Sequence, residues 1–166
     1  IHAIYDSGNY SEKFEQDIIE ADKSIVISSP ELRQDKIERL LYLLKPRQEA
    51  GVQITVITTD PENTSFGSPG VLYELIAGMK EARIFVQTKE EVEERFAVID
   101  DELVWHGGVN LLGKEDLWDN LMRIKNEQVA AELLEIALGN IPDRSIDAGN
   151  PCRVIRRITE ADKRIK

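Results

Sequence analysis

Two short runs of β-branched residues, SIVISS at 24–29 and VQITVITT at 52–59, constrain the fold of this chain most. Each is apolar over most of its length, which is typical of a strand buried on both faces of a parallel sheet. The stretch between them, DKIERLLYLLKPRQEAG at 35–51, has the pattern of an amphipathic helix and ends at a glycine, as a capped helix would. A strand, a helix and a second strand in this order predict a parallel βαβ unit.

The alternation continues along the chain and changes near its middle. Residues 60–70 have the composition of a loop, and Ser11 is the predicted N-cap of an early helix. RFAVID and ELVWHGG are separated by Asp100-Asp101, which predicts a hairpin. The other predicted strands are HAIYD, RIFVQ and LMRI, and the other predicted helices are YSEKFEQDIIEA, VLYELIAGMKEA and NEQVAAELLEIAL, the last ending at Gly139.

These patterns predict an α/β fold with a mixed sheet of about six to eight strands and helices on both faces. We place the domain at residues 1–140 and a polar, basic C-terminal tail or linker at 141–166. The basic end of that tail, PCRVIRRITEADKRIK, fits a solvated helix or a frayed end. It also fits a phosphate-contacting arm or a junction to a neighbouring domain.

Composition narrows the classes of function. The net charge of −10 argues against a domain that coats itself with nucleic acid, although a local basic site remains compatible with it. The sequence has no apolar run of membrane-spanning length. Cys152 is the single cysteine, so an intramolecular disulfide is excluded and a reducing cytoplasm is the expected location. A first residue of Ile rather than Met suggests a processed piece or a domain of a longer protein.

Several familiar site patterns are missing from the sequence. It contains no GxxxxGK[ST] phosphate loop and no GxGxxG after a strand, so nucleotide binding of those kinds is not supported. It also lacks Cys/His metal spacing and a serine nucleophile elbow. We therefore expect neither a cofactor nor a metal.

One set of polar and glycine positions has a characteristic spacing. A single residue separates the first two positions, four residues precede an aspartate, and six more precede a Gly-Gly-x-Asn ending. The positions are Glu93, Arg95, Asp100, Gly107, Gly108 and Asn110. This spacing resembles the His-x-Lys, Asp, Gly-Ser-x-Asn signature of the phospholipase D superfamily, the HKD phosphodiesterases and nucleases.

The resemblance extends over roughly residues 3–138. IEADKSIVISSPEL is similar to the family's early helix-strand-Ser-Pro segment, and GVQITVITTD is similar to its second strand. DNLMRIKNEQVAAEL is similar to the closing strand and helix, where Asp119 matches the carboxylate that begins the strand. The run from VWHGGVNLLG to DNLMRI is similar to the versions attached to bacterial and archaeal helicases and other DNA-processing proteins.

The resemblance implies roles for these positions. In the family, a histidine attacks phosphorus, a second histidine from another copy of the motif serves the leaving group, and Lys, Asn and Ser bind the non-bridging oxygens. The candidate catalytic positions are Glu93, Arg95, Asp100, Asn110 and Asp119, and the candidate phosphate-binding positions are Arg95, Gly108 and Asn110. One copy of the motif is half of such a site, so we expect a homodimer in which the 93–119 segments face each other.

Three positions depart from the family pattern: Glu93 replaces His, Arg95 replaces Lys and Gly108 replaces Ser. Arginine still holds phosphate oxygens in pairs, and Gly108 keeps a backbone N–H while it loses a hydroxyl. A carboxylate at Glu93 would repel a phosphodiester, because unit charges about 4 Å apart interact by about 4 kcal/mol at an effective dielectric near 20. These departures predict a loss of catalysis.

Glu93 has other interpretations. It could itself attack phosphorus and form a glutamyl-phosphate. It could pair with Arg95, two residues away on a predicted strand and so on the same side, and thereby occupy the phosphate cradle. It could also gather with Asp100 and Asp119 to hold a divalent cation. We favour a hydrogen-bonded remnant of a lost site over these three.

The aromatic residues around the motif have structural and functional interpretations. Trp105 and His106 should point to opposite faces of their strand, with Trp105 packing or covering the mouth of the site. We expect His106 to be a satisfied or exposed strand residue, and a relocated nucleophile is the alternative. Trp118 is expected in core or rim packing, with base stacking as the alternative.

The sequence therefore predicts a catalytically degenerate phospholipase D-like domain. We expect it to be a nucleic-acid-associated or dimerisation module of a larger helicase-like protein, with DNA or RNA backbone as a candidate partner and no membrane association. An active phosphodiesterase or nuclease with divergent chemistry is one alternative. A sensor domain for a small phosphorylated ligand is another.

Overall fold

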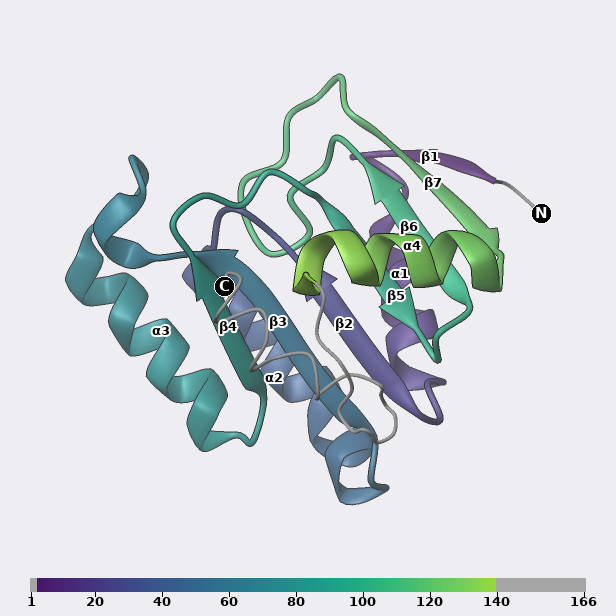
Figure 1. Cartoon of the computed structure of the whole chain (residues 1–166), viewed down its shortest axis with the longest axis horizontal. Coiled ribbons are helices and arrows are strands. Elements are labelled where there is room, and N and C mark those ends of the chain that lie inside the picture. Colours follow the sequence, from purple (N-terminus) through teal and green to yellow (C-terminus); the bar gives the residue numbers. More distant parts are fainter. Residues whose placement is uncertain (1–2, 140–166) are drawn as a thin grey trace. The chain divides into compact units, whose positions relative to one another are not determined.

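The structure, a computed structural model, describes residues 3–139. Seven strands form one sheet in the order β1-β7-β6-β5-β2-β3-β4 (Figure 1). The strands are β1 (Ile4–Asp6), β2 (Ser24–Ser28), β3 (Gln53–Thr59), β4 (Phe85–Lys89), β5 (Phe96–Ile99), β6 (Leu103–Gly107) and β7 (Asn120–Lys125). The helices are α1 (Ser11–Ile19), α2 (Gln34–Glu49), α3 (Pro69–Glu81) and α4 (Glu127–Leu138), and a 3₁₀ turn, η1, spans Pro61–Asn63.

The sheet has a parallel half and an antiparallel half. β2, β3 and β4 run parallel, and α2 and α3 connect them in sequence, as the βαβ pattern predicts. β5 pairs antiparallel with β2, and β6, β7 and β1 continue the sheet in antiparallel fashion. The predicted mixed α/β sheet is confirmed, and its seven strands fall within the predicted range.

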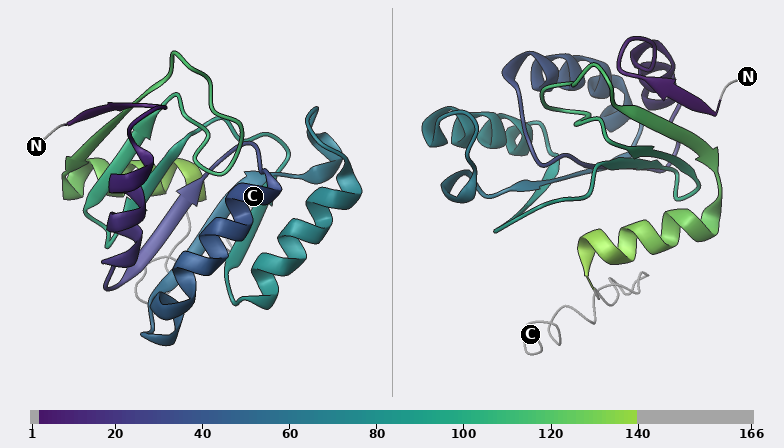
Figure 2. Two further views of the ribbon diagram at one scale, coloured as in Figure 1. Left: turned by 180° about the vertical axis from the view of Figure 1, so that it is seen from behind. Right: turned by 90° about the horizontal axis from the view of Figure 1, so that it is seen from above.

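The sheet and its first three helices belong to one compact unit, Ile1–Glu127. α1, α2 and α3 lie on one face of the sheet (Figure 2). Buried apolar side chains fill this layer, and removing each from water contributes about 1.5–3 kcal/mol. They include Ile25 and Ile27 of β2, Ile54 and Val56 of β3, and Ile37, Leu44, Leu72 and Met79 of the helices.

α4 spans the segment predicted to be the last helix, and its apolar residues recur at helical spacing. Gly139 follows with φ of 73°, the left-handed conformation that glycine adopts most readily after a helix. The predicted end of this helix at Gly139 is therefore confirmed. The basic tail at 141–166 lies outside the described residues.

The turn between β5 and β6 is the predicted hairpin. Asp100 and Asp101 have φ of 57° and 59°, and the Glu102 amide donates to the Ile99 carbonyl at 3.2 Å. Positive φ at both central residues is what a two-residue type I′ turn requires, and aspartate tolerates this conformation better than most side chains.

Two helix starts differ from the prediction. Ser11 is the first residue of α1 rather than its N-cap, which is Tyr10, and no side chain caps this end. The Tyr10 ring is instead buried in the core, so packing rather than a side-chain cap fixes the start of α1. α3 begins at Pro69, inside the predicted loop, because the Ser68 hydroxyl accepts from the Val71 amide and proline suits the first turn.

A buried ion pair ties α1 to β6 and β7. The Asp17 carboxylate is 4% exposed and accepts from both Arg123 Nε at 2.7 Å and Arg123 Nη2 at 2.9 Å. The Trp105 indole N–H donates to the same carboxylate at 2.8 Å. These partners replace the water that a buried charge loses, which is the condition for burying it. The Trp105 ring packs against Tyr5 and Phe14, with centroids 5.0 and 5.6 Å away.

Candidate functional site

Most of the motif positions meet at one edge of the sheet. Arg95 immediately precedes β5, Gly107 ends β6, and Asp119 immediately precedes β7. The strand pairing sets these ends side by side, because Phe96 pairs with His106 and Gly107 pairs with Leu121. We call this the motif edge, and it comprises the end of β2, the start of β5, the end of β6 and the start of β7.

Asp100 lies at the opposite end of β5. Its carboxylate accepts from three successive backbone amides, at 3.1 Å from Asp22, 2.6 Å from Lys23 and 3.2 Å from Ser24. The Asp100 amide in turn donates to the Ser24 carbonyl at 2.8 Å. Asp100 therefore joins the β5–β6 turn to the start of β2, and the structure does not bring it to the other motif residues.

Arg95 is directed into the motif edge rather than toward Glu93. Its Nη1 donates to the Gly108 carbonyl at 2.6 Å. Glu93 is exposed, and within residues 3–139 no ion pair joins it to Arg95. The strand argument for that pair fails because β5 begins only at Phe96, so the two residues do not alternate as strand neighbours.

The two glycines mark close approaches between segments. A Cβ atom at Gly107 would lie 2.0 Å from the Asn120 carbonyl oxygen, so the backbones of β6 and β7 leave no room for a side chain. A Cβ atom at Gly108 would lie 2.7 Å from Asp119 Oδ1. The Asp119 carboxylate thus occupies the space that a side chain at position 108 would need. The Gly108 amide donates to the Asn120 backbone carbonyl at 2.9 Å, so it is not free to bind a ligand.

Asn110 is the motif residue with an unused hydrogen-bonding atom. It is 4% exposed, and its Oδ1 atom is buried without a hydrogen-bond partner. Its backbone carbonyl accepts from Gly113 at 3.2 Å, which fixes the turn after the motif. Burying a polar atom without a partner costs about 1–3 kcal/mol, so Asn110 carries a desolvation cost within the described residues at this edge.

The three carboxylates proposed as a metal site do not gather. Asp100 is engaged with backbone amides at the far end of β5, whereas Asp119 packs on Gly108. Within residues 3–139, no group of three or more His, Cys, Asp or Glu side chains is arranged to hold a metal ion.

Trp105 and His106 take opposite faces of β6, as their alternation predicts. Trp105 is fully buried in the aromatic cluster, and His106 is exposed. Trp105 therefore packs in the core instead of covering the mouth of a site. The expectation for Trp118 is wrong, because its side chain is 89% exposed and packs in neither core nor rim.

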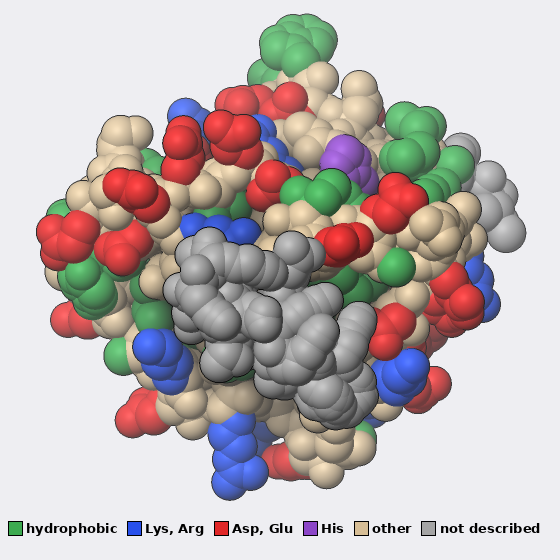
Figure 3. All heavy atoms as spheres, viewed as in Figure 1, with side chains coloured by type: hydrophobic (Ala, Val, Ile, Leu, Met, Phe, Trp, Pro, Cys, Tyr) green, Lys and Arg blue, Asp and Glu red, His purple; other side chains and the backbone are tan. Residues whose placement is uncertain are grey.

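The motif edge is acidic. The connection from β4 to β5 reads EEVEE over residues 90–94, and Glu90, Glu91 and Glu93 are exposed. With Glu31, Glu90 and Glu91 line an open hollow of about 460 Å³ at this edge. Acidic side chains gather along the upper side of the molecule in Figure 3, where the edge lies.

Two basic residues, Lys89 and Arg95, adjoin these carboxylates and are outnumbered by them. Burial lowers the pKa of the Lys89 ammonium, although the charge of Glu94 opposes that effect. Arg95 is already bound to the Gly108 carbonyl. The edge therefore presents mainly negative charge to an approaching ligand.

The loop between β6 and β7 is held by a partly buried hydrogen-bonded group. The Tyr10 hydroxyl donates to Glu115 Oε2 at 2.5 Å, and Lys36 Nζ donates to the same oxygen at 2.6 Å. Burial raises the pKa of the Glu115 carboxyl, but the hydrogen bonds from Lys36 and Tyr10 outweigh it, so this pKa lies below its ordinary value. Beyond this brace, Leu117 and Trp118 are 80% and 89% exposed.

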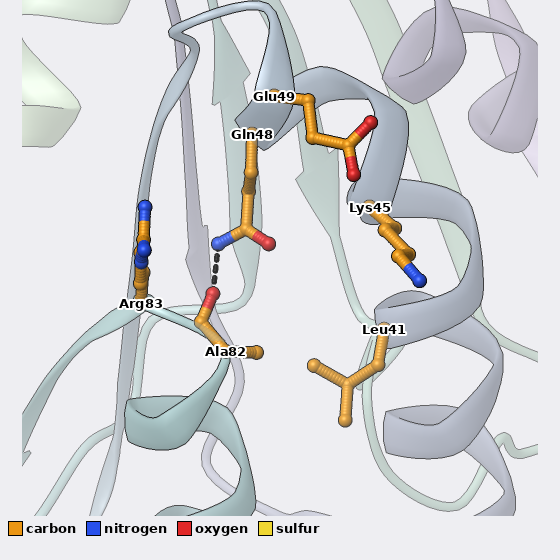
Figure 4. A pocket seen from close by; sticks show the side chains of 6 residues that line it. All are labelled: Leu41, Lys45, Gln48, Glu49, Ala82 and Arg83. Carbon is orange, nitrogen blue, oxygen red and sulfur yellow. Dashed lines mark hydrogen bonds between the residues drawn. The ribbon is translucent and has the colours of Figure 1, made fainter.

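A second hollow lies at the other end of the parallel strands. It has a volume of about 440 Å³ and lies between the last turn of α2 and the end of α3 (Figure 4). The Gln48 amide donates to the Ala82 carbonyl across it. Lys45, Glu49 and Arg83 bring charges of both signs and converge on no common point (Figure 4). This hollow lies at the opposite ends of the parallel strands from Arg95, Gly108 and Asp119, so the candidate site remains the motif edge.

Known proteins resemble this chain in fold rather than in sequence. No protein-family model matches the sequence, and no curated protein matches it. Solved structures do match. The phospholipase D family member Nuc from Salmonella typhimurium aligns with a TM-score of 0.61 at 17% identity, covering 82% of this chain and 89% of that chain. NucT from Helicobacter pylori aligns with a TM-score of 0.60 at 16% identity, over 82% of this chain and 92% of that chain.

The chain has the phospholipase D fold. TrmBL2, an archaeal chromatin protein with a novel mode of DNA binding, also aligns, with a TM-score of 0.56 at 15% identity over 83% of this chain and 52% of that chain. The expected fold class is thus confirmed. Within residues 3–139, this phospholipase D fold includes no helix that is long and apolar enough to cross a membrane.

Sequence reasoning proposed the motif positions but missed two features of the edge. The contact between Gly108 and Asp119 was not predicted, although glycine in place of serine was its signal. The brace at Glu115 was also missed, because Tyr10 and Lys36 are 105 and 79 residues away in the sequence.

Proposed function

We propose that this chain is a catalytically degenerate phospholipase D-like domain, a nucleic-acid-associated or dimerisation module of a larger helicase-like protein in the cytoplasm. The observation that carries the proposal is the hydrogen bond that Arg95 makes, together with the exposed carboxylate at Glu93. The cation that would hold phosphate donates to the Gly108 carbonyl, and an exposed carboxylate occupies the nucleophile's position. Arg95 keeps its charge but has one donor fewer for phosphate, and a carboxylate stands where the family has its histidine, which supports the loss of attack on phosphorus.

The energetic argument is electrostatic. A phosphodiester next to Glu93 meets a like charge, and about 4 Å of separation at an effective dielectric near 20 amounts to about 4 kcal/mol. The exposed carboxylates of Glu90 and Glu91 add to this repulsion. Loss of a hydrolase nucleophile alone lowers the rate by about 10⁶-fold, so the remaining hydrogen bonds do not sustain turnover.

A link with nucleic acid is supported by the structural similarity to TrmBL2, a chromatin protein that binds DNA. In this proposal the domain contributes assembly rather than cleavage, and its 93–119 face is the contact face. Self-association through that face is the form of assembly that a single half-site predicts. Sedimentation at tens of micromolar tests it, and a monomer throughout would contradict the homodimer.

Hydrolysis assays test the absence of catalysis. Single-stranded DNA, duplex DNA and bis(p-nitrophenyl) phosphate are incubated with the purified domain, both in EDTA and with added Mg²⁺ or Mn²⁺. Glu93→Ala is compared with the matched control Glu91→Ala, which removes an exposed carboxylate from the same segment. We expect all three proteins to show the same background rate.

Turnover that Glu93→Ala abolishes and Glu91→Ala preserves would overturn the proposal. It would make Glu93 a working nucleophile, and trapping a covalent phospho-adduct on that side chain would establish the intermediate.

A further inference from the structure

Leu117 and Trp118 form an exposed apolar pair beside the motif edge, which we call the tip. Their exposed fractions are 80% and 89%, the highest among the large apolar side chains of residues 3–139. Single exposed apolar residues are common on protein surfaces, but adjacent ones on a loop beside a site indicate a contact surface. Tryptophan is also the residue most enriched among the anchors of protein interfaces.

The loop that carries the tip is held in place. Glu115 accepts from Tyr10 at 2.5 Å and from Lys36 at 2.6 Å, just before the tip. The Asp119 amide donates to the Asp116 carbonyl at 3.3 Å, which closes a turn around the two apolar side chains. A surface fixed before binding loses less conformational entropy when a partner arrives, so a braced loop suits an anchor.

The charge around the tip is mainly negative, although Lys114 is exposed three residues before Leu117. Asp116 and Asp119 flank it in the sequence, and the carboxylates of 90–94 lie along the same motif edge. Arg95, the nearest motif cation, is engaged with the Gly108 carbonyl. A mainly negative surface attracts a cationic partner, and it makes contact with nucleic-acid phosphates or with a second copy of the same surface less favourable.

We propose that the tip and the carboxylates around it form a docking surface for a cationic polypeptide, a segment rich in Lys or Arg with an apolar recess or side chain for Trp118. Complementary charge steers and orients such a partner, and burial of the tip supplies the affinity. This inference rests on the loss of catalysis in the proposed function, because a phosphodiesterase would need the same edge open to anions. It gives the tip a partner different from the nucleic acid or second copy considered there.

A displayed library of random peptides tests the surface, using the intact chain as bait. Selection is run in parallel against the unaltered chain, against the double variant Leu117→Ser/Trp118→Ser, and against Tyr42→Ser. Tyr42 is 73% exposed on α2, so its loss is a matched control for removing an exposed aromatic side chain. Enriched peptides are sequenced, and their affinities are measured at low and at high salt.

We expect enrichment of peptides that carry both net positive charge and an apolar residue. Their affinity should fall about thirtyfold in the double variant, stay unchanged in Tyr42→Ser, and weaken as salt screens the carboxylates. Asp116→Lys, which reverses a charge without removing the tip, should also weaken binding.

Enrichment of neutral or acidic peptides, or equal enrichment by the double variant, would overturn the docking proposal. Tip-dependent binding of a DNA oligonucleotide would assign the surface to nucleic acid, and a dimer lost in the double variant would assign it to a second copy. Either result would also contradict it. The hydrolysis assays above report separately on the proposed function, so either proposal can fail while the other stands.

Discussion

The two ends of β5 use acidic side chains in opposite ways. At one end, the Asp100 carboxylate is matched by the backbone amides of Asp22, Lys23 and Ser24. At the other end, Glu93 is exposed without such partners in the described chain, and Arg95 turns to a carbonyl instead. The comparison shows that one short motif contains two separable parts. The Asp100 part serves folding whether or not the Glu93 part can support a reaction.

The largest loss of stability should come from a substitution at Asp100. Asp100→Ala removes the acceptor for three amides and places alanine at φ of 57°, where an L side chain is strained. Hydrogen bonds to a charged group contribute about 1.5–3 kcal/mol each, but these are partly open to solvent, so we expect a loss of about 3 kcal/mol. Urea unfolding measures the change.

Asp101→Ala is the matched control for this variant. Asp101 has a similar φ of 59°, yet its carboxylate makes a surface ion pair with Lys23 at 3.4 Å. Surface pairs contribute about 1 kcal/mol or less, so the control should lose far less stability. Equal losses in the two variants would mean that the turn conformation, and not the amide contacts, makes this end rigid.

A smaller effect is expected at Glu115, on the motif-edge side. Glu115→Gln weakens the bonds from Tyr10 and Lys36, and we expect a loss of about 1 kcal/mol at neutral pH. The folded-state pKa of Glu115 is lowered, so its contribution is present above the ordinary value of 4.5 and is lost as pH falls through the folded pKa.

Unfolding at a series of pH values checks that sign. The stability difference between the unaltered chain and Glu115→Gln should shrink as pH falls from about 6 to about 3. A difference that grows on acidification would show that the brace is not held by an ionised Glu115.

The contact between Gly108 and Asp119 should give an effect of about 1 kcal/mol. Gly108→Ser puts a side chain where Asp119 Oδ1 lies 2.7 Å from the Cβ position, and the flexible carboxylate can partly move away. The penalty should nearly vanish in the Asp119→Ala background. A double-mutant cycle measures this coupling, and additive losses would show that the two positions do not compete for space.

The smallest effect is spectroscopic and leaves stability unchanged. Trp105 is fully buried and Trp118 is 89% exposed, so Trp118 should account for the fluorescence that quenchers reach. Because the edge is acidic, Cs⁺ should quench Trp118 fluorescence more strongly than I⁻ does, with quenching of free tryptophan as the reference. Added salt should reduce this difference between the two ions. Trp118→Phe should remove the effect, and stronger quenching by I⁻ would show that the surroundings are not negative.

The fold could be predicted from sequence wherever one pattern dominated. SIVISS and VQITVITT are apolar enough to define buried strands, and Asp100-Asp101 marks the hairpin. The start of α1 could not be predicted, because burial of the Tyr10 ring outweighs the capping preference of Ser11. Local propensity is decisive only where tertiary packing does not compete with it.

The positions of the candidate site could be proposed from the sequence, but their contacts could not. Spacing suggests Arg95 and Gly108, and similarity to the family's closing strand suggests Asp119, yet neither shows that Arg95 donates to Gly108 or that Asp119 fills the space beside it. Those contacts depend on how three strand ends approach each other. Trp118 was mispredicted for a related reason. Its loop is anchored at Glu115 by Tyr10 and Lys36, which are distant in the sequence, so the local pattern does not show where the loop lies.

The pairing of the first strand with the last has a consequence for how this chain is made. Ile4 pairs with Met122, and Asp17 meets Arg123 across 106 residues of sequence. During synthesis, β1 and α1 leave the ribosome long before their partners exist. Until β7 emerges, the Asp17 carboxylate has only the 3.9 Å contact with Lys13 of the same helix, so it must stay hydrated until Arg123 and Trp105 can enclose it. Truncations that stop before Arg123 should therefore be prone to aggregation, and slow translation of the segment before β7 would prolong that exposure.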